Sequence, residues 1–244
     1  IAVVGDTGIG ERAFYQGFLA VAAALGKEKP DLLLHLGDFV YQPEVFPESC
    51  AMQYKNDIFQ YLIKPFPLHL FVPGDNDLAP VRGKPKASGC WEYIESLDAF
   101  FDEVRGSPEA SPGPSEGTKT VGPILFAVLN AQHESDPTPW LKPRVEKARK
   151  EGRWIIFAIH EPAITTAWFI DKRQTLLKTL NSLHPDFVFA GNQHSYERFH
   201  QIGNPNLDGT LPTVKSDAAE HQRGNGAIHI ITGGGGATLK PFAD

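Results

Sequence analysis

The sequence contains little cysteine or methionine and no long hydrophobic run. Its 244 residues include only two cysteines, Cys50 and Cys90, which are too few for a disulfide scaffold or a cysteine-based zinc site. They could form one bridge between loops, or both could be free. No apolar run approaches the ~20 residues that a membrane-spanning helix needs. A disulfide-rich miniprotein is therefore excluded, and no membrane span is expected.

The single methionine is Met52, so Ile1 is not the start of translation. Either a processed leader or a deliberate truncation would explain this. The missing residues are expected to be a leader rather than a domain, because Ile1 begins a predicted strand just before the first candidate ligand, Asp6. A secreted or periplasmic location is favoured because the N-terminus is missing, although any targeting signal has gone with the missing residues and the location stays open.

Basic residues are outnumbered, with 23 Lys and Arg against 29 Asp and Glu, and the formal charge is −6. This balance argues against binding to a nucleic-acid backbone. The hydrophobic fraction of 41% and the charged fraction of 21% are those of a globular protein and exclude a disordered or fibrous chain. Glycine and proline together make up about 18% of the residues, against a typical ~12%, which predicts many shaped loops.

Short apolar runs alternate with amphipathic segments along most of the chain. Predicted strands cover residues 1–4, 31–36, 68–72, 124–129, 154–159, 187–190 and 227–232. Predicted helices cover residues 12–25, 54–63, 92–104, 140–150 and 172–183, and residues 106–122 are predicted to form a loop. Because the strands are continuously apolar, both of their faces should be covered, which predicts an α/β fold with a largely parallel sheet. No linker or break in composition divides the chain, so we predict one domain over residues 1–244.

Polar side chains directly follow five of the predicted strands. They are Asp6, Asp38, Asp75, Asp77, His160, Asn192 and His194. Ligands of α/β sheets bind beyond the carboxyl ends of the strands, so these side chains can converge on one site. A single Gly-Asp pair is more often a turn or a helix cap. Five strand ends with carboxylate or imidazole groups instead predict a cation site built from oxygen and nitrogen ligands.

Five short segments lie at these strand ends: GDTG at 5–8, GDFVY at 37–41, GDND at 74–77, HEP at 160–162 and GNQH at 191–194. In this order they resemble the motifs GDxG, GDxxY, GNH[DE], VxxH and GHxH of the calcineurin-like metallophosphoesterases. The tyrosine of the second motif and the run HSYER at 194–198 are most similar to the purple acid phosphatase branch. The resemblance implies a layered αββα sandwich and a centre with two metal ions.

The resemblance also implies a set of metal ligands and a reaction. The first metal would be held by Asp6, Asp38, Tyr41 and His194, and the second by Asp38, Asp75, His160 and Asn192. The two ions would be divalent or trivalent iron, manganese or zinc, and a metal-bound hydroxide would hydrolyse a small phosphate monoester or diester. Neither the identity of the substrate nor the oligomeric state can be read from the sequence.

Three positions depart from the family motifs. Asp75 stands in place of an asparagine and Asn192 in place of a histidine. The extra carboxylate makes the ligands of the second site harder, and the loss of an imidazole makes its metal binding weaker. Together the two exchanges favour Mn²⁺, Mg²⁺ or Fe²⁺ over Zn²⁺. Asn76 replaces the histidine that contacts phosphate, so it can donate a hydrogen bond but cannot supply the ~10²–10⁴-fold assistance of a general acid. Asn76, Asp77 and His133 are the candidate catalytic residues, although His133 is more simply a solvent-exposed loop residue.

Two alternatives to a two-metal enzyme stay open. The substitutions at positions 76 and 192 suit a catalytically impaired member that binds metal or phosphate without turnover, and the intact first site alone suits a one-metal variant. Three other histidines, His35, His69 and His229, lie inside predicted strands and are expected to be packed structural residues. The glycines at 233–236 lack the ending of a phosphate-binding loop, so we expect them to permit a close backbone approach near the site.

Overall fold

The structure is a computed structural model. It describes residues 1–8, 12–41, 54–78, 115–130, 136–166, 174–204, 206, 208, 210–212, 221 and 223–241.

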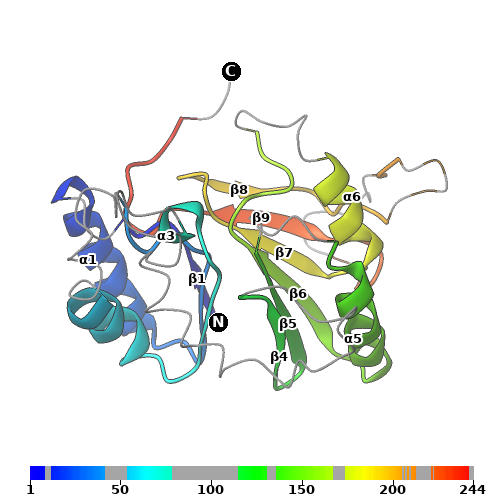
Figure 1. Cartoon of the computed structure of the whole chain (residues 1–244), viewed down its shortest axis with the longest axis horizontal. Coiled ribbons are helices and arrows are strands. Elements are labelled where there is room, and N and C mark those ends of the chain that lie inside the picture. Colours follow the sequence, from blue (N-terminus) through cyan, green and yellow to red (C-terminus); the bar gives the residue numbers. More distant parts are fainter. Residues whose placement is uncertain are drawn as a thin grey trace.

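The described strands form two sheets (Figure 1). In the first sheet, β1 (Ala2–Val4), β2 (Leu33–His35) and β3 (His69–Phe71) pair in parallel. The second sheet has the order β4-β5-β6-β7-β9-β8, with β4 (Gly117–Val121), β5 (Ile124–Leu129), β6 (Trp154–Ile159), β7 (Phe187–Ala190), β9 (Ile228–Thr232) and β8 (Tyr196–Arg198). Among the strand pairs that the structure describes in this sheet, β4–β5 and β8–β9 are antiparallel and the others are parallel. The predicted α/β fold with largely parallel sheets is confirmed.

Helices cover the outer faces of both sheets (Figure 1). The helix α1 (Arg12–Glu28) and the π-helix η2 (Tyr54–Ile63) pack on the first sheet, whereas α5 (Thr138–Lys150) and α6 (Gln174–Ser182) pack on the second. A one-turn helix, α3 (Asp75–Leu78), follows β3 directly. None of the described helices is long and apolar enough to cross a membrane.

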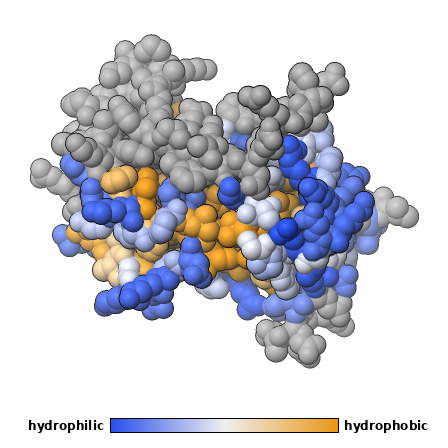
Figure 2. All heavy atoms as spheres, turned by 90° about the horizontal axis from the view of Figure 1, so that it is seen from below, coloured by the Kyte–Doolittle hydropathy of each residue, from blue (hydrophilic) through white to orange (hydrophobic). Residues whose placement is uncertain are grey.

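Alternate residues of the strands build the layers, because successive strand side chains point to opposite faces. Leu33 packs outward with Phe18 of α1, whereas Leu34 packs inward with Phe126 of β5, so the two sheets face each other across a shared core. Leu125, next to Phe126, packs outward in the cluster that includes α5 and α6. Seen from below, apolar residues lie across the middle of the visible face, between hydrophilic residues (Figure 2).

One predicted loop is partly wrong. We expected loop throughout residues 106–122, but β4 pairs antiparallel with β5 over its whole length. The glycine, proline and serine content that suggested a loop lies mainly before β4, whereas β4 itself contains the β-branched residues Thr118, Thr120 and Val121, which are enriched in strands. Gly122, with φ of 54°, makes the turn between the two strands. Residues 106–114 and the predicted helix at 92–104 lie outside the described residues.

The three histidines predicted to be structural are indeed buried: His35, His69 and His229. His229 Nε2 lies 2.9 Å from Asn181 Oδ1; because a carbonyl oxygen only accepts, the imidazole donates this hydrogen bond. Burial lowers the pKa of His229 from 6.5 to about 3. The folded protein therefore keeps this side chain neutral under conditions in which an unfolded chain would protonate it.

His229 should make the stability of the protein depend on pH. Since the pKa is lower in the folded state, the free energy of unfolding falls as the pH drops below 6.5, and His229 should account for about 2 kcal/mol of the loss between about pH 7 and about pH 5. Urea unfolding at the two pH values measures this loss. His229→Gln, which can still donate to Asn181 but does not titrate, should reduce the loss by this amount. An equal loss in wild type and variant would contradict the assignment.

Candidate metal centre

Three strand ends share an unusual backbone conformation. Asp6, Asp38 and Asn192 have φ values of 60°, 56° and 62°, in the left-handed region that aspartate and asparagine tolerate better than other non-glycine residues. Each follows a glycine. At Gly37, an added Cβ would lie 2.7 Å from both the Gly74 nitrogen and His160 Nδ1. The Gly-Asx pairs therefore turn the chain sharply at the strand ends and leave room for the next motif.

Asp6, Asp38 and His160 form a group in which one ligand atom from each residue lies within 4.8 Å of the others. All three side chains are buried. His160 Nδ1 lies 2.6 Å from the Leu36 carbonyl oxygen and donates to it. The other ring nitrogen, Nε2, faces the acids, at 3.4 Å from Asp38 Oδ1 and 3.0 Å from Asp75 Oδ1. The contact with Leu36 thus fixes which nitrogen is presented to a cation.

His194 is held in the same way on the other side of the group. Its Nδ1 donates to the Thr238 carbonyl oxygen over 2.7 Å. Its Nε2 lies 2.7 Å from the Tyr41 hydroxyl and 3.4 Å from Asp6 Oδ1. Tyr41 also donates to Asp6 Oδ1 over 3.2 Å. Six of the seven predicted metal ligands thus come together through their side chains: Asp6, Asp38, Tyr41, Asp75, His160 and His194.

The electrostatics of the group are those of buried acids that interact with a buried imidazole. Burial raises the pKa of Asp6, and Asp38 adds to this effect. Burial also acts to raise the pKa of Asp38, but His160 and the donors of Asn76 outweigh it and the pKa is lowered. Burial alone would lower the pKa of His160, yet Asp38, then Asp75 and Asp6, hold it well above its ordinary value. The buried carboxylates therefore favour a positive charge beside them, which His160 provides here.

The donor set fits a metal ion. Buried carboxylates need a charged partner or a coordinated cation, and carboxylate oxygens together with imidazole nitrogens suit iron, manganese or zinc. The two imidazoles already have their second nitrogen anchored on a backbone carbonyl, as metal-bound histidines usually do. The residues present are therefore suited to bind divalent metal, while the element itself is not fixed by them.

Asn76 and Asp77 both form hydrogen bonds with Asp38 or with the backbone beside it. The Asn76 amide donates to Asp38 Oδ2 over 2.7 Å, and its backbone nitrogen donates to Asp38 Oδ1 over 3.0 Å. Asp77 is fully buried and accepts from the backbone nitrogens of Asp38, Phe39 and Gly74 at 2.8, 2.9 and 3.0 Å. The Asp77 carboxylate thus shapes the loop that presents Asp38, and a catalytic role for Asp77 stays a prediction.

Of the two remaining candidates, the structure gives backbone contacts for Asn192 and does not describe His133. Asn192 contributes its backbone to the group, because its nitrogen donates to Asp6 Oδ2 over 2.9 Å and its carbonyl oxygen accepts from Lys240 Nζ over 3.0 Å. His133 lies outside the described residues.

The contacts of Thr238 and Lys240 were not foreseen, since these residues lie more than forty positions from the motif that they touch and carry no motif of their own.

The glycines at 233–236 approach the group as predicted. A Cβ on Gly233 would lie 2.8 Å from Asp6 Oδ2 and 2.1 Å from the Gln193 carbonyl oxygen. A Cβ on Gly235 would lie 2.3 Å from the Gly5 carbonyl oxygen. The close backbone approach expected there is confirmed, and it brings the segment with Thr238 and Lys240 over the fifth motif.

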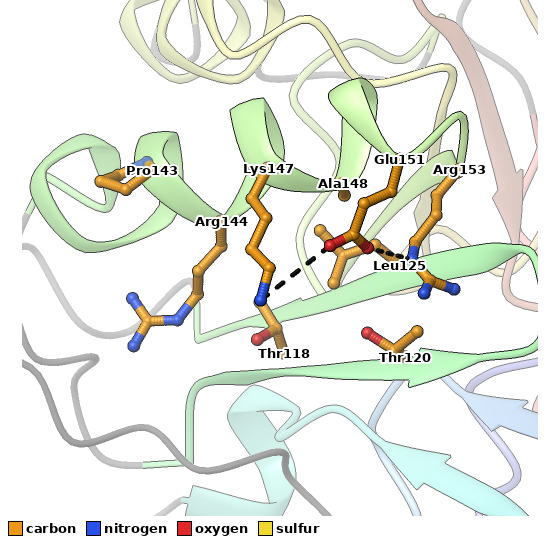
Figure 3. Close-up of a pocket in the computed structure, with 9 residues that line it drawn as sticks. All are labelled: Thr118, Thr120, Leu125, Pro143, Arg144, Lys147, Ala148, Glu151 and Arg153. Carbon is orange, nitrogen blue, oxygen red and sulfur yellow. Dashed lines mark hydrogen bonds and ion pairs between the residues drawn. The ribbon is translucent and has the colours of Figure 1, made fainter.

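A separate pocket of about 420 Å³ lies between α5 and the strands β4 and β5 (Figure 3). Arg144, Lys147 and Arg153 line it together with Glu151, which pairs with Arg153 over 2.8 Å and with Lys147 over 4.0 Å. None of the predicted site residues that the structure describes lines this pocket. Arg144 and Lys147 belong to α5 and Arg153 follows it, so these basic side chains lie apart from the candidate centre.

A comparison with protein families matches residues 1–196 to the calcineurin-like phosphoesterase model. Among curated proteins, purple acid phosphatase 22 of Arabidopsis thaliana is 29% identical over 126 residues, which is 49% of this chain and 25% of that protein. A probable inactive purple acid phosphatase 1 of the same plant is 29% identical over 112 residues, covering 39% of this chain and 16% of that protein. The match spans no more than a quarter of either relative.

Among solved structures, a purple acid phosphatase from yellow lupin seeds superimposes with a TM-score of 0.70 at 19% identity. The match covers 99% of this chain and 45% of the lupin chain. At this identity the likeness concerns the fold, and it agrees with the two facing sheets and their outer helices described above.

Proposed function

This chain belongs to the calcineurin-like phosphoesterase family, and we propose that it is a metal-dependent hydrolase of phosphate esters with a two-metal centre. The observation that carries the proposal is the buried group of Asp6, Asp38 and His160. His194 and Tyr41 adjoin it on one side, and Asp75 adjoins it on the other.

In the proposed centre, Asp38 lies between two sets of ligands. Asp6, Tyr41 and His194 would hold one ion with Asp38, and Asp75, His160 and Asn192 would hold the other. Bound metal ions would polarise the phosphate oxygens and lower the pKa of a coordinated water. The second set is the weaker one, since an asparagine there replaces an imidazole.

The remaining residues would hold these ligands in place. Asn76 donates to both oxygens of Asp38 and so orients the carboxylate shared by the two sets. Asp77 fixes the backbone around Asp38 through its contacts with main-chain nitrogens.

His133 stays a candidate for protonating the leaving group. The substrate class is a small phosphate monoester or diester.

Hydrolysis of p-nitrophenyl phosphate and of bis-p-nitrophenyl phosphate tests the proposal directly. Protein freed of metal with a chelator and then supplied with Mn²⁺, Fe²⁺ or Zn²⁺ should release p-nitrophenolate from at least one of the two esters, and chelated protein should not. Absence of turnover with every metal would contradict the proposed activity.

A second candidate is a member of the fold that binds metal without turnover. It is favoured by Asn76, whose amide is engaged by Asp38 and cannot transfer a proton. Metal content separates the two functions when it is measured beside turnover. Stoichiometric binding of Mn²⁺ without hydrolysis of either ester would favour this second candidate.

Iron-loaded, oxidised protein should be coloured if Tyr41 is a ligand. The Tyr41 hydroxyl lies 2.7 Å from His194 Nε2. Burial, then Asp6 and Asp38, raise the pKa of Tyr41, so the phenol should lose its proton only to a bound cation. A tyrosinate bound to Fe³⁺ would give a visible charge-transfer band. The absorption spectrum should lose this band in Tyr41→Phe and keep it in Tyr61→Phe, and a colourless iron-loaded protein would remove Tyr41 from the ligands.

A further inference from the structure

Glu197 is a buried carboxylate that the proposed centre does not use. It lies in the edge strand β8 with 6% of its surface exposed, next to Tyr196, which is 65% exposed. Its four hydrogen bonds come from neutral groups on Thr165, Thr166 and Ser195. Since a buried carboxylate is costly unless it is well hydrogen-bonded, these contacts tie Glu197 firmly to its surroundings.

The two loops that meet at Glu197 both carry predicted metal ligands. Oε2 accepts from the backbone nitrogen of Thr166 over 2.7 Å and from its hydroxyl over 3.1 Å. Oε1 accepts from the Thr165 hydroxyl over 2.9 Å and from the Ser195 hydroxyl over 3.1 Å. The two threonines end the described loop that begins at His160, and Ser195 directly follows His194.

The loop after β6 has no regular secondary structure over residues 161–166. At its start, the Gly191 nitrogen donates to the His160 carbonyl oxygen over 2.9 Å. Residues 161–166 then run without helix or strand, so no regular backbone ladder sets their course. The carboxylate of Glu197 anchors the far end of this loop.

We propose that Glu197 is a positioning residue that sets the separation between His160 and His194, and with it the affinity of the centre for metal ions. This inference rests on the proposed function, because it takes both histidines to be metal ligands. Glu197 would touch neither the metal ions nor the substrate. Its effect would pass through the two loops that it joins.

Three variants separate positioning from general stability. Glu197→Ala removes all four contacts. Glu197→Gln is the conservative variant: its oxygen can still accept from the Thr166 nitrogen, while its amide group can donate to hydroxyls that rotate to accept. Asp186→Ala is the matched control, because Asp186 is also a buried acid and accepts from the backbone nitrogens of Ile155 and Gly224, but it lies before β7, at the end of the strand opposite the centre.

Titration calorimetry with Mn²⁺ gives the affinity, and thermal unfolding gives the stability. Glu197→Ala should bind Mn²⁺ about tenfold more weakly than wild type. Glu197→Gln should recover most of the affinity, and Asp186→Ala should lose stability with unchanged affinity. If Glu197→Ala does not fold, Thr165→Val should still weaken binding, because it removes one donor from Oε1.

Wild-type affinity in Glu197→Ala, or in Thr165→Val where Glu197→Ala does not fold, would overturn the inference and leave the proposed function standing. Equal weakening in Asp186→Ala would also overturn it, because the effect would then reflect general loosening. Failure of the wild type to bind Mn²⁺ would overturn both the inference and the proposed metal centre.

Discussion

Asp38→Asn should reduce the hydrolysis of p-nitrophenyl phosphate about 10³-fold or more, since loss of metal stabilisation costs several kcal/mol of the barrier. The side chain keeps its size but loses its charge between His160 and the proposed first set of ligands. The new amide would also place a donor opposite the Asn76 amide, which now donates to Asp38 Oδ2 over 2.7 Å. Both changes act on the carboxylate that the two sets of ligands share.

Asp31→Asn is the matched control for this variant. Asp31 is exposed and precedes β2 at the end away from the centre. Asp31→Asn therefore removes the same charge as Asp38→Asn, but at the opposite end of the same strand. Its turnover should equal that of wild type. If Asp38→Asn kept wild-type turnover and metal content, the shared carboxylate would have no part in the reaction.

Asn192→His should strengthen the weaker half of the centre, with Mn²⁺ binding there about 10–100-fold tighter. Asn192 has φ of 62°, and histidine is among the residues that tolerate this region better than most. The residue follows β7 and its backbone nitrogen already donates to Asp6. An imidazole at this position adds a good nitrogen ligand where the sequence has an amide.

Equilibrium dialysis against Mn²⁺ measures the number of bound ions and their affinity in the variant. Asn206→His is the control for an imidazole at the surface, because Asn206 is exposed; it should leave binding unchanged. Unchanged stoichiometry and affinity in a folded Asn192→His would show that position 192 does not face a metal ion.

The convergence of the centre could be predicted because the polar residues follow the strands closely in the sequence. Five of the apolar runs end in a Gly-Asx pair or a histidine, and parallel pairing then brings these ends to one side of the molecule. Asp6, Asp38, His160 and His194 were placed in this way. The structure adds that both histidines are anchored through Nδ1 on backbone carbonyls.

The parts that could not be predicted depend on distant partners or on the direction of a side chain. The motif placed Asp77 at the site, but it could not show that the Asp77 carboxylate accepts hydrogen bonds from the main-chain nitrogens of Asp38 and Phe39 after Gly37. The contact between Thr238 and His194 joins residues 44 positions apart and follows only from the course of the glycine-rich segment. Glu197 could be read as part of a motif, whereas its bonds to Thr165 and Thr166 required the fold.

Anomalous scattering from crystals grown with Mn²⁺ tests the central claim most directly, because it counts and locates the ions without reference to any substrate. We expect one peak beside Asp38 toward His194 and Tyr41, and a weaker one beside Asp38 toward His160 and Asp75. Crystals that show these side chains clearly, with no anomalous peak among them at saturating Mn²⁺, would contradict a metal centre at this site.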